Sequence, residues 1–175
     1  MARPFTFDLE SCRDLLLKME RELERLKGTD VRQEVIDHGF NFAVTAWHMT
    51  EWAWADMGDK HQFKLEIRKE LGKPPSKLSR DDFQKYVCEK SKPIDYCRVI
   101  ATASKHLGVD HPSEFEAITS AKPTGPVLVS GEYGLSIDAR ATLKIVVDGE
   151  RLPAIDTFEL ALAYWTTFIH ENRIG

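Results

Sequence analysis

The sequence predicts an α+β fold, in which a bundle of about five to six helices is followed by a small antiparallel β-sheet and a C-terminal helix. Apolar residues recur at three- and four-residue steps through most of the chain up to residue 107, which is the period of amphipathic helices. Short β-branched segments separated by glycines follow and indicate two to three strands. A length of 175 residues suits one compact domain.

We therefore expect a single domain over residues 1–175. Its parts would be a helical region over about 8–107, a loop over 108–125, a β-element over about 126–155 and a C-terminal helix over about 157–170.

The first helix is predicted from Leu9 to Lys27, with Asp8 as its N-cap. One narrow apolar stripe runs along it, formed by Leu9, Cys12, Leu16, Met19, Leu23 and Leu26. The opposite face is charged and typical of a solvated surface, with Arg13, Lys18, Glu20, Arg21, Glu24 and Arg25. Such a stripe packs inside its own bundle or against the helix of a partner.

The second helix is predicted from Val31 to Met57, with Asp30 as its cap and Gln33 in the answering position of a capping box. Because it is rich in Phe, Val, Ala and Trp, we expect it to be the central helix. Three shorter helices are predicted to follow. The first spans about 60–71, and the second begins at Ser79 with Asp82 in the answering position of its capping box. The third runs from Pro93 to about 107.

The last third of the chain has a different pattern. Residues 108–125 are expected to be loop with one helical turn at 113–118, and strands are expected at 127–129, 135–137 and 141–147. Asp148-Gly149 predicts a hairpin turn. Asp156, with Glu159 in its box, would cap a final buried helix through Ile169 whose apolar residues are Phe158, Leu160, Leu162, Ala163, Trp165 and Phe168.

Composition narrows the class of protein. The net charge of −4 shows no large basic footprint of the kind that duplex-DNA binders carry. Neither a signal-peptide pattern nor an apolar run long enough to cross a membrane is present, so a cytoplasmic protein without membrane contact is expected. Cys12, Cys88 and Cys97 fit reduced thiols that act as small hydrophobes.

The second helix carries a stripe of short polar side chains where long Lys and Glu side chains would coat an ordinary exposed face. On a helical wheel its members share an arc of about 80°. They are Asp37, Asn41, Thr45, His48 and Trp52, with Glu51 beside them. A central helix with such a stripe often lines a polar cavity.

The fifth helix offers a second polar face, formed by Arg98, Thr102, Lys105 and His106. If the two faces meet, the acid–base candidates are His48, His106, Lys105 and Asp37. Candidates for holding an anionic ligand are Asn41, Thr45, Glu51, Trp52, Arg98 and Thr102. The alternative is that these residues only form ion pairs and hydrogen bonds that support the fold.

No cofactor or metal site is expected from the sequence. A Gly-rich phosphate loop, a G-x-S-x-G elbow and an H-E-x-x-H motif are all absent. His48 and Glu51 stand three residues apart, as in half of a helix-bundle metal site, but no second pair completes the ligand set.

Two segments carry a resemblance to known proteins. The stretch Asn41–Trp52 (NFAVTAWHMTEW) and the Ser104-Lys-His motif resemble a group of small bacterial proteins to which no activity is assigned. More distantly the chain is similar to HEPN domains, helical bundles found in many bacterial RNases and defence systems. Their pattern of Arg, four to six residues and His matches Arg32 and His38. This resemblance implies RNA cleavage that needs no metal.

Two functions remain open from the sequence, and it does not decide whether the protein is an enzyme. The first is a polar site between helices that binds RNA or a small anionic ligand, with a HEPN-like RNase as its catalytic form. The second is a non-catalytic interaction protein that self-associates through the stripe of the first helix and the apolar last helix.

Overall fold

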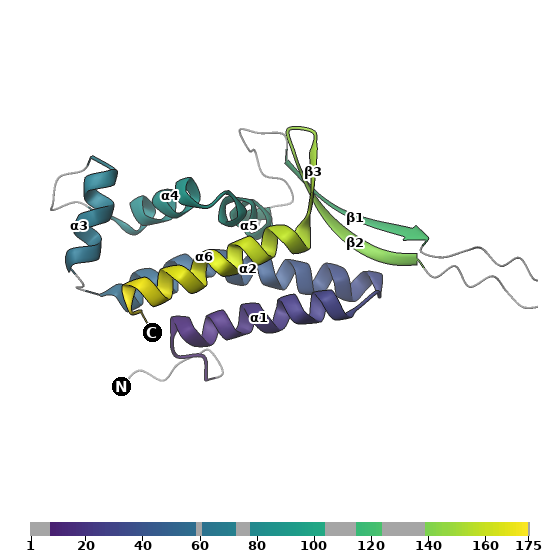
Figure 1. Cartoon of the computed structure of the whole chain (residues 1–175), viewed down its shortest axis with the longest axis horizontal. Helices are drawn as coiled ribbons and strands as arrows, with labels where there is room; N and C mark the ends of the chain where they lie inside the picture. Colours follow the sequence, from purple (N-terminus) through teal and green to yellow (C-terminus); the bar gives the residue numbers. More distant parts are fainter. Residues whose placement is uncertain (1–7, 59–60, 73–77, 104–114, 124–138, 175) are drawn as a thin grey trace, which may run out of the picture.

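The computed structural model describes residues 8–58, 61–72, 78–103, 115–123 and 139–174 (Figure 1). Within these ranges the chain forms six helices and a three-stranded antiparallel sheet that precedes the last helix, which confirms the predicted fold class. In chain order the elements are α1 (Cys12–Gly28), α2 (Arg32–Met57), α3 (His61–Glu70), α4 (Arg80–Lys90), α5 (Lys92–Ala103), β1 (Phe115–Pro123), β2 (Ala139–Val147), β3 (Glu150–Pro153) and α6 (Ala154–Asn172).

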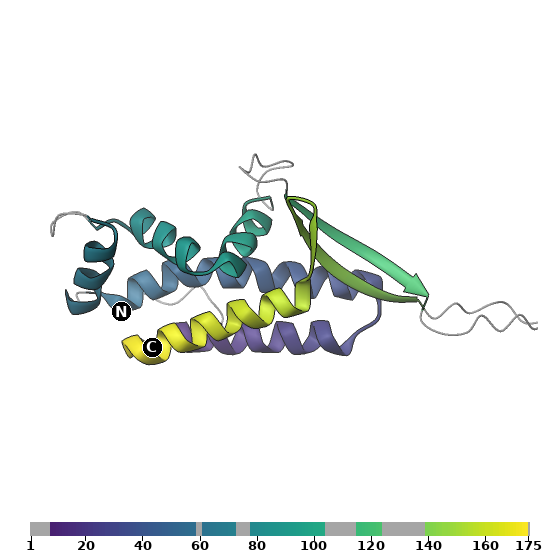
Figure 2. The same ribbon diagram turned by 45° about the horizontal axis from the view of Figure 1, so that its top comes forward.

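The central element is α2, as its composition predicted. It contacts α1, α4, α5, α6 and the sheet. In both views α1, α2 and α6 run lengthwise beside one another, α4 and α5 cover another side of α2, and the long β1–β2 hairpin extends away at the far end from α3 (Figures 1 and 2). The core therefore lies around α2.

The apolar stripe of α1 packs inside the molecule, against α2 and α6. Its members Cys12, Leu16, Met19, Leu23 and Leu26 are all buried, as predicted. This face is therefore unavailable to a partner helix.

The α6 side of α2 is packed with aromatic rings. Phe42 stacks on Phe158 with ring centroids 4.5 Å apart, and the buried Trp165 donates from Nε1 to the carbonyl oxygen of Ala46 at 3.0 Å. The expectation that α6 is buried on nearly all sides is wrong, because Leu160 and Ala163 are exposed. A helix at the edge of a bundle buries one stripe only.

Two predicted helix starts are corrected. In α1 the cap is Ser11 instead of Asp8, and Asp14 completes a capping box with it. In α2 the N-cap is Val31, which makes no side-chain cap bond, so the predicted cap at Asp30 is wrong. In both cases more than one polar residue precedes the apolar pattern, and the pattern alone does not select among them.

The predicted capping box of Ser79 and Asp82 at the start of α4 is confirmed. The box predicted at Asp156 is wrong, because α6 begins directly after β3 with Pro153 as its N-cap. Asp156 lies in the first turn, where a carboxylate still complements the helix dipole.

The sheet has the order β1-β2-β3, with Phe115 opposite Val147 and Lys144 opposite Pro153. Half of the expected loop 108–125 is wrong, because β1 spans 115–123 and also takes the place of the helical turn expected at 113–118 over its described residues. The rest of the expected loop lies outside the described residues. The alanines, serine and lysine of β1 are poor strand formers, so propensity did not indicate a strand.

The third predicted strand is confirmed and begins two residues earlier than expected, at Ala139. Its hairpin turn is also confirmed, since Asp148 and Gly149 both adopt positive φ, at 50° and 82°. The strands expected at 127–129 and 135–137 lie outside the described residues.

None of the helices in the described ranges combines the length and the apolar character that crossing a bilayer requires.

Candidate functional site

At Asn41 and Thr45 the polar stripe of α2 lies along the margin of the contact between α1 and α2. Thr45 is buried there, and its hydroxyl accepts from Lys18 Nζ and donates to the carbonyl oxygen of Asn41, both at 2.6 Å. Asn41 itself is exposed. The helix that faces this part of the stripe is therefore α1, whereas the sequence led us to consider α5.

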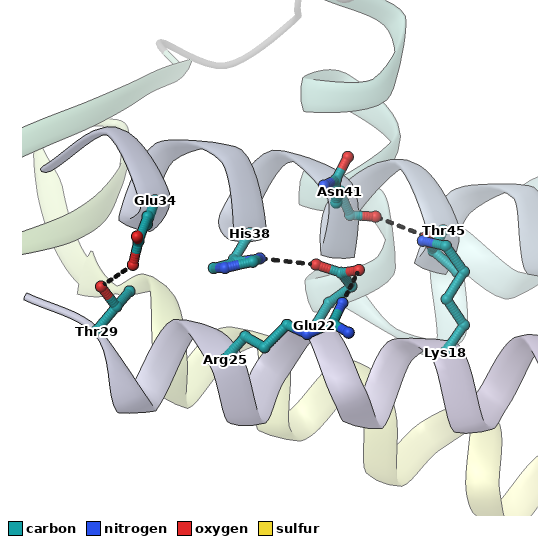
Figure 3. A network of polar contacts seen from close by, with 8 residues as sticks. All are labelled: Lys18, Glu22, Arg25, Thr29, Glu34, His38, Asn41 and Thr45. Carbon is teal, nitrogen blue, oxygen red and sulfur yellow. Dashed lines mark hydrogen bonds and ion pairs between the residues drawn. The ribbon is translucent and has the colours of Figure 1, made fainter. Parts of the chain in front are cut away.

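We call this margin the seam. It consists of Lys18, Glu22 and Arg25 of α1, of Thr29 at the C-cap of that helix, and of Glu34, His38, Asn41 and Thr45 of α2, which line up along the two antiparallel helices (Figure 3). At its far end the Thr29 hydroxyl bonds to the Glu34 carboxylate.

The centre of the seam is the carboxylate of Glu22, whose side chain is only 7% exposed. Its Oε1 accepts from an Arg25 guanidinium nitrogen at 3.1 Å, and its Oε2 lies 2.9 Å from Nδ1 of His38. Since an ionised carboxylate only accepts hydrogen bonds, this contact places the proton of a neutral imidazole on Nδ1. Nε2 is then the basic nitrogen, on a side chain that is partly exposed.

Lys18 lies in the seam half-buried, one turn before Glu22. The loss of hydration lowers the pKa of its ammonium group. The Glu22 carboxylate opposes that shift, whereas the neighbouring Arg21 and Arg25 add to it. Lys18 and Arg25 of the seam, with Arg21 beside them on α1, thus lie around the buried carboxylate of Glu22, while the second acid of the seam, Glu34, lies at its far end beside Thr29.

The remaining residues of the stripe have other surroundings. Asp37 is exposed and accepts from the Gln33 side chain at 3.0 Å, and Glu51 lies 3.6 Å from Arg80 at the start of α4. His48 is exposed, and Trp52 is partly buried against the core. None of these placements tests the roles predicted for them, which stay predictions.

The polar face of α5 lies elsewhere. Arg98 donates from Nε to Asp95 at 2.8 Å, and the Thr102 hydroxyl donates to the carbonyl oxygen of Arg98 at 2.8 Å. Arg98 lines an open pocket of about 470 Å³ together with Trp47 of α2 and Cys88 of α4. Arg98 of α5 thus shares a pocket with Trp47 of α2, which lies outside the polar stripe. Lys105 and His106 lie outside the described residues.

The cysteines are unpaired thiols, and Cys12 and Cys97 are buried. Burial, reinforced by Asp95, raises the pKa of Cys88 to about 12. The thiol in the open pocket is therefore protonated at neutral pH and unsuited to nucleophilic attack.

The sequence pattern missed five residues of the seam, among them the three around its buried carboxylate. It assigned Lys18 and Arg25 to the solvated face of the first helix, and it gave Glu22 no role. A signal was present, because Glu22 follows Met19 by three residues and precedes Leu26 by four, so it lies at the edge of the apolar stripe. A charged side chain at the edge of an apolar stripe indicates a buried ion pair.

Among the described residues, no group of three or more His, Cys, Asp or Glu side chains is placed to hold a metal ion. Comparison of the chain with protein-family models, curated proteins and solved structures finds no match.

Proposed function

We propose that the seam binds phosphate groups, carried by RNA or by a smaller phosphorylated molecule. The observation that supports this most is the buried Glu22 carboxylate, which holds Arg25 and His38 beside the half-buried Lys18. A fixed group of cations needs little reordering when an anion arrives, so less entropy is lost on binding.

The donors of the seam are not used up by its internal contacts. A guanidinium has five N–H groups, and Arg25, with a side chain 56% exposed, gives one nitrogen to Glu22. The Lys18 ammonium has three protons and gives one to Thr45. Arg and Lys are the side chains that bind phosphate oxygens most strongly, and partial burial strengthens the attraction.

The reaction that we propose for bound RNA is cleavage without a metal. His38 Nε2 takes the proton of a 2′-hydroxyl, whose oxygen then attacks the adjacent phosphorus. The P–O5′ bond breaks, the 5′-oxygen takes a proton from solvent, and a 2′,3′-cyclic phosphate remains. Arg25 and Lys18 would stabilise the charge that develops on the non-bridging oxygens.

This proposal modifies the HEPN resemblance. Six residues along the uninterrupted helix α2 correspond to a rotation of about 240°, so Arg32 and His38 leave the helix on different sides. The guanidinium that shares a partner with His38 is that of Arg25. We therefore expect Arg25 to matter more for RNA cleavage than Arg32.

Binding can be tested with a labelled single-stranded RNA at low salt. We expect Lys18→Met and Arg25→Gln each to weaken binding about tenfold and to reduce the slope of log K against log salt by about 0.7. Arg13→Gln, which removes an exposed cation on the same helix outside the seam, is the matched control and should bind as the wild type does. Competition by a nucleoside monophosphate at equal phosphate concentration would identify a small-molecule site. Wild-type binding by both seam variants would overturn the proposal.

Cleavage is tested separately, in the presence of a metal chelator. His38→Asn should abolish cleavage and keep binding, because the asparagine amide nitrogen can replace Nδ1 as the donor to Glu22. A DNA oligonucleotide of the same sequence should be bound and left intact, since it lacks the 2′-hydroxyl. Cleavage by His38→Asn at the wild-type rate would contradict the reaction and leave the binding proposal standing.

A further inference from the structure

We propose that the cavity between α2 and the sheet binds a small uncharged molecule built on a single aromatic ring. This inference is independent of the phosphate site. Ile36, Gly39 and Phe40 of α2 line the cavity. On a helical wheel these residues centre about 180° away from His38 and Thr45 of the seam. The two sites therefore lie on opposite sides of α2, and each can be altered without the other.

The size of the cavity matches one ring. It lies where α2, α5, α6 and the sheet meet, and it has a volume of about 140 Å³. Packed protein interiors leave few voids larger than a water molecule, whereas an apolar cavity of about 150 Å³ stays dry and holds one benzene molecule. The apolar walls are formed by Ile36 of α2, Ile100 of α5, Phe158 of α6 and Leu143 and Ile145 of β2.

Contacts outside the cavity hold its walls in place. Phe158 stacks on Phe42 with ring centroids 4.5 Å apart, and Ile145 is only 1% exposed. The hairpin touches α2 at Gly39, where an added Cβ would meet both Leu143 and Phe158. The hairpin therefore cannot close further onto α2, and the cavity exists before a ligand arrives. A preformed site loses less entropy on binding.

The described side chains that face the cavity carry no charge. In the β1–β2 ladder Ala117 pairs with Ile145 and Thr119 pairs with Leu143, so these four residues share one face of the sheet. Lys144 lies between Leu143 and Ile145, and its side chain leaves the sheet on the other face. An ionised ligand would lose its hydration in this cavity without gaining a partner. The ligand that fits is therefore uncharged.

Two features at the rim define the ligand further. Thr119 places a half-buried hydroxyl on the cavity face of β1, which can bond to one polar group of a ligand. Phe40 is 41% exposed and, with the exposed Ala117, marks the opening. The rings of Phe40 and Phe158 can contact a ligand ring edge to face. Phenol, with one ring and one hydroxyl, is the probe that combines these features.

Binding is tested on the full chain with phenol, benzene and benzoate. At about ten times their Kd, phenol and benzene should each raise the melting temperature by about 3–6 °C. Benzoate, an ion at neutral pH, should leave it unchanged at the same concentration. A melting temperature that neither phenol nor benzene raises, or that benzoate raises equally, would overturn the proposal.

Methyl NMR spectra of the same samples locate the probe. The ring current of bound benzene should shift the methyl signals of Ile100 and Ile145, which line the cavity. The methyl signals of Ile67 on α3, at the far end of the molecule from the hairpin, should stay unchanged (Figure 1). Shifts at Ile67 as large as those at Ile100 would contradict binding in this cavity.

Two substitutions change the cavity volume in opposite directions. Ala117→Leu adds a side chain on the cavity face of β1 and should weaken benzene binding about tenfold. Glu116→Leu adds the same side chain on the other face of the strand and, as the matched control, should bind as the wild type does. Leu143→Ala enlarges the cavity and should raise the affinity for naphthalene relative to benzene about tenfold, a gain that unfolding cannot produce. Unchanged binding in Ala117→Leu, or an unchanged preference in Leu143→Ala, would overturn the proposal.

Discussion

α6 and α1 both pack along α2, and the two contacts differ in chemistry. On the α6 side the contact consists of rings such as Phe158 and Trp165, whose indole N–H bonds to the backbone of Ala46. On the α1 side an apolar centre that includes Met19 is bordered by the charged seam around Glu22. The first contact depends on shape and apolar area, which salt and pH change little. The second depends on the attraction between charged groups, which both salt and pH change.

Under the proposal that the seam binds phosphate, stability and ligand binding are placed on separate sides of one helix. A substitution that removes side-chain volume from an apolar contact lowers the free energy of unfolding. A charged margin contributes less to stability, and it leaves donors available to a ligand. Substitutions on the two sides should therefore differ in magnitude and in their response to solution conditions.

The largest effect is expected on the α6 side. Trp165→Ala should lower the free energy of unfolding by about 3–5 kcal/mol, because it leaves a cavity in the fully buried core. Trp165→Phe keeps a ring and removes the hydrogen bond to Ala46, so its loss should be about 1–2 kcal/mol. Urea unfolding measures both values. Equal losses for the two variants would show that the hydrogen bond, and not the packing, dominates this contact.

In the seam, Glu22→Ala should lower the free energy of unfolding by about 2 kcal/mol, because Arg25 and His38 lose their shared acceptor. The matched control is Glu24→Ala on the same helix, whose carboxylate is exposed, and it should change stability by less than about 0.5 kcal/mol. A Glu22 loss as large as that of Trp165→Ala would remove the distinction between the two sides.

The junction of α2 with the hairpin tests a third kind of contact. A Cβ added at Gly39 would lie 2.1 Å from a Leu143 methyl group, so Gly39→Ala forces that side chain to move. Overpacking costs about 1–3 kcal/mol, whereas alanine gains about 1 kcal/mol over glycine inside a helix. The single substitution should therefore destabilise or be neutral.

In a Leu143→Ala background the clash is removed, and the same substitution should then stabilise by about 1 kcal/mol. Thermal melts of the four proteins in this cycle measure the reversal of sign. Destabilisation in both backgrounds would show that the backbone of the hairpin, and not the Leu143 side chain, limits the approach.

Much of the fold is predictable from local patterns. The stripe of α1, the box of Ser79 and the Asp148-Gly149 turn are each encoded within a few residues, and all three are confirmed. The error at β1 has a non-local cause. β1 is a strand because β2 pairs with it, although its alanines, lysine and proline are depleted in strands.

The site was predictable in part. The wheel of α2 identified Asn41 and Thr45, which do lie in the seam. It could not identify the facing helix, because a periodic pattern fixes a face and not its neighbour. Lys18 was classed as a solvated charge for the same reason, and only the packing of α1 on α2 reveals that it is half-buried.

The smallest effect separates two lysines of α1 by the sign of their pH dependence. Burial lowers the pKa of Lys18, so between that lowered value and the ordinary lysine value of about 10.4 the unfolded chain binds more protons than the folded one. Stability of the wild type relative to Lys18→Met should therefore rise as pH increases through this window.

Lys27 provides the opposite case. Its bond to Glu159 raises its pKa, so the stabilisation is fully present below the ordinary lysine value and is lost as pH rises through the raised one. The wild type should therefore lose its advantage over Lys27→Met above the ordinary lysine value, whereas it gains on Lys18→Met in the window below that value. Melting temperatures of the three proteins, measured from pH 8 upward through the ordinary lysine pKa of about 10.4, report both trends. The same direction for both lysines would mean that Lys18 is hydrated in the folded protein, and the desolvated cation on which the proposed phosphate binding depends would be absent.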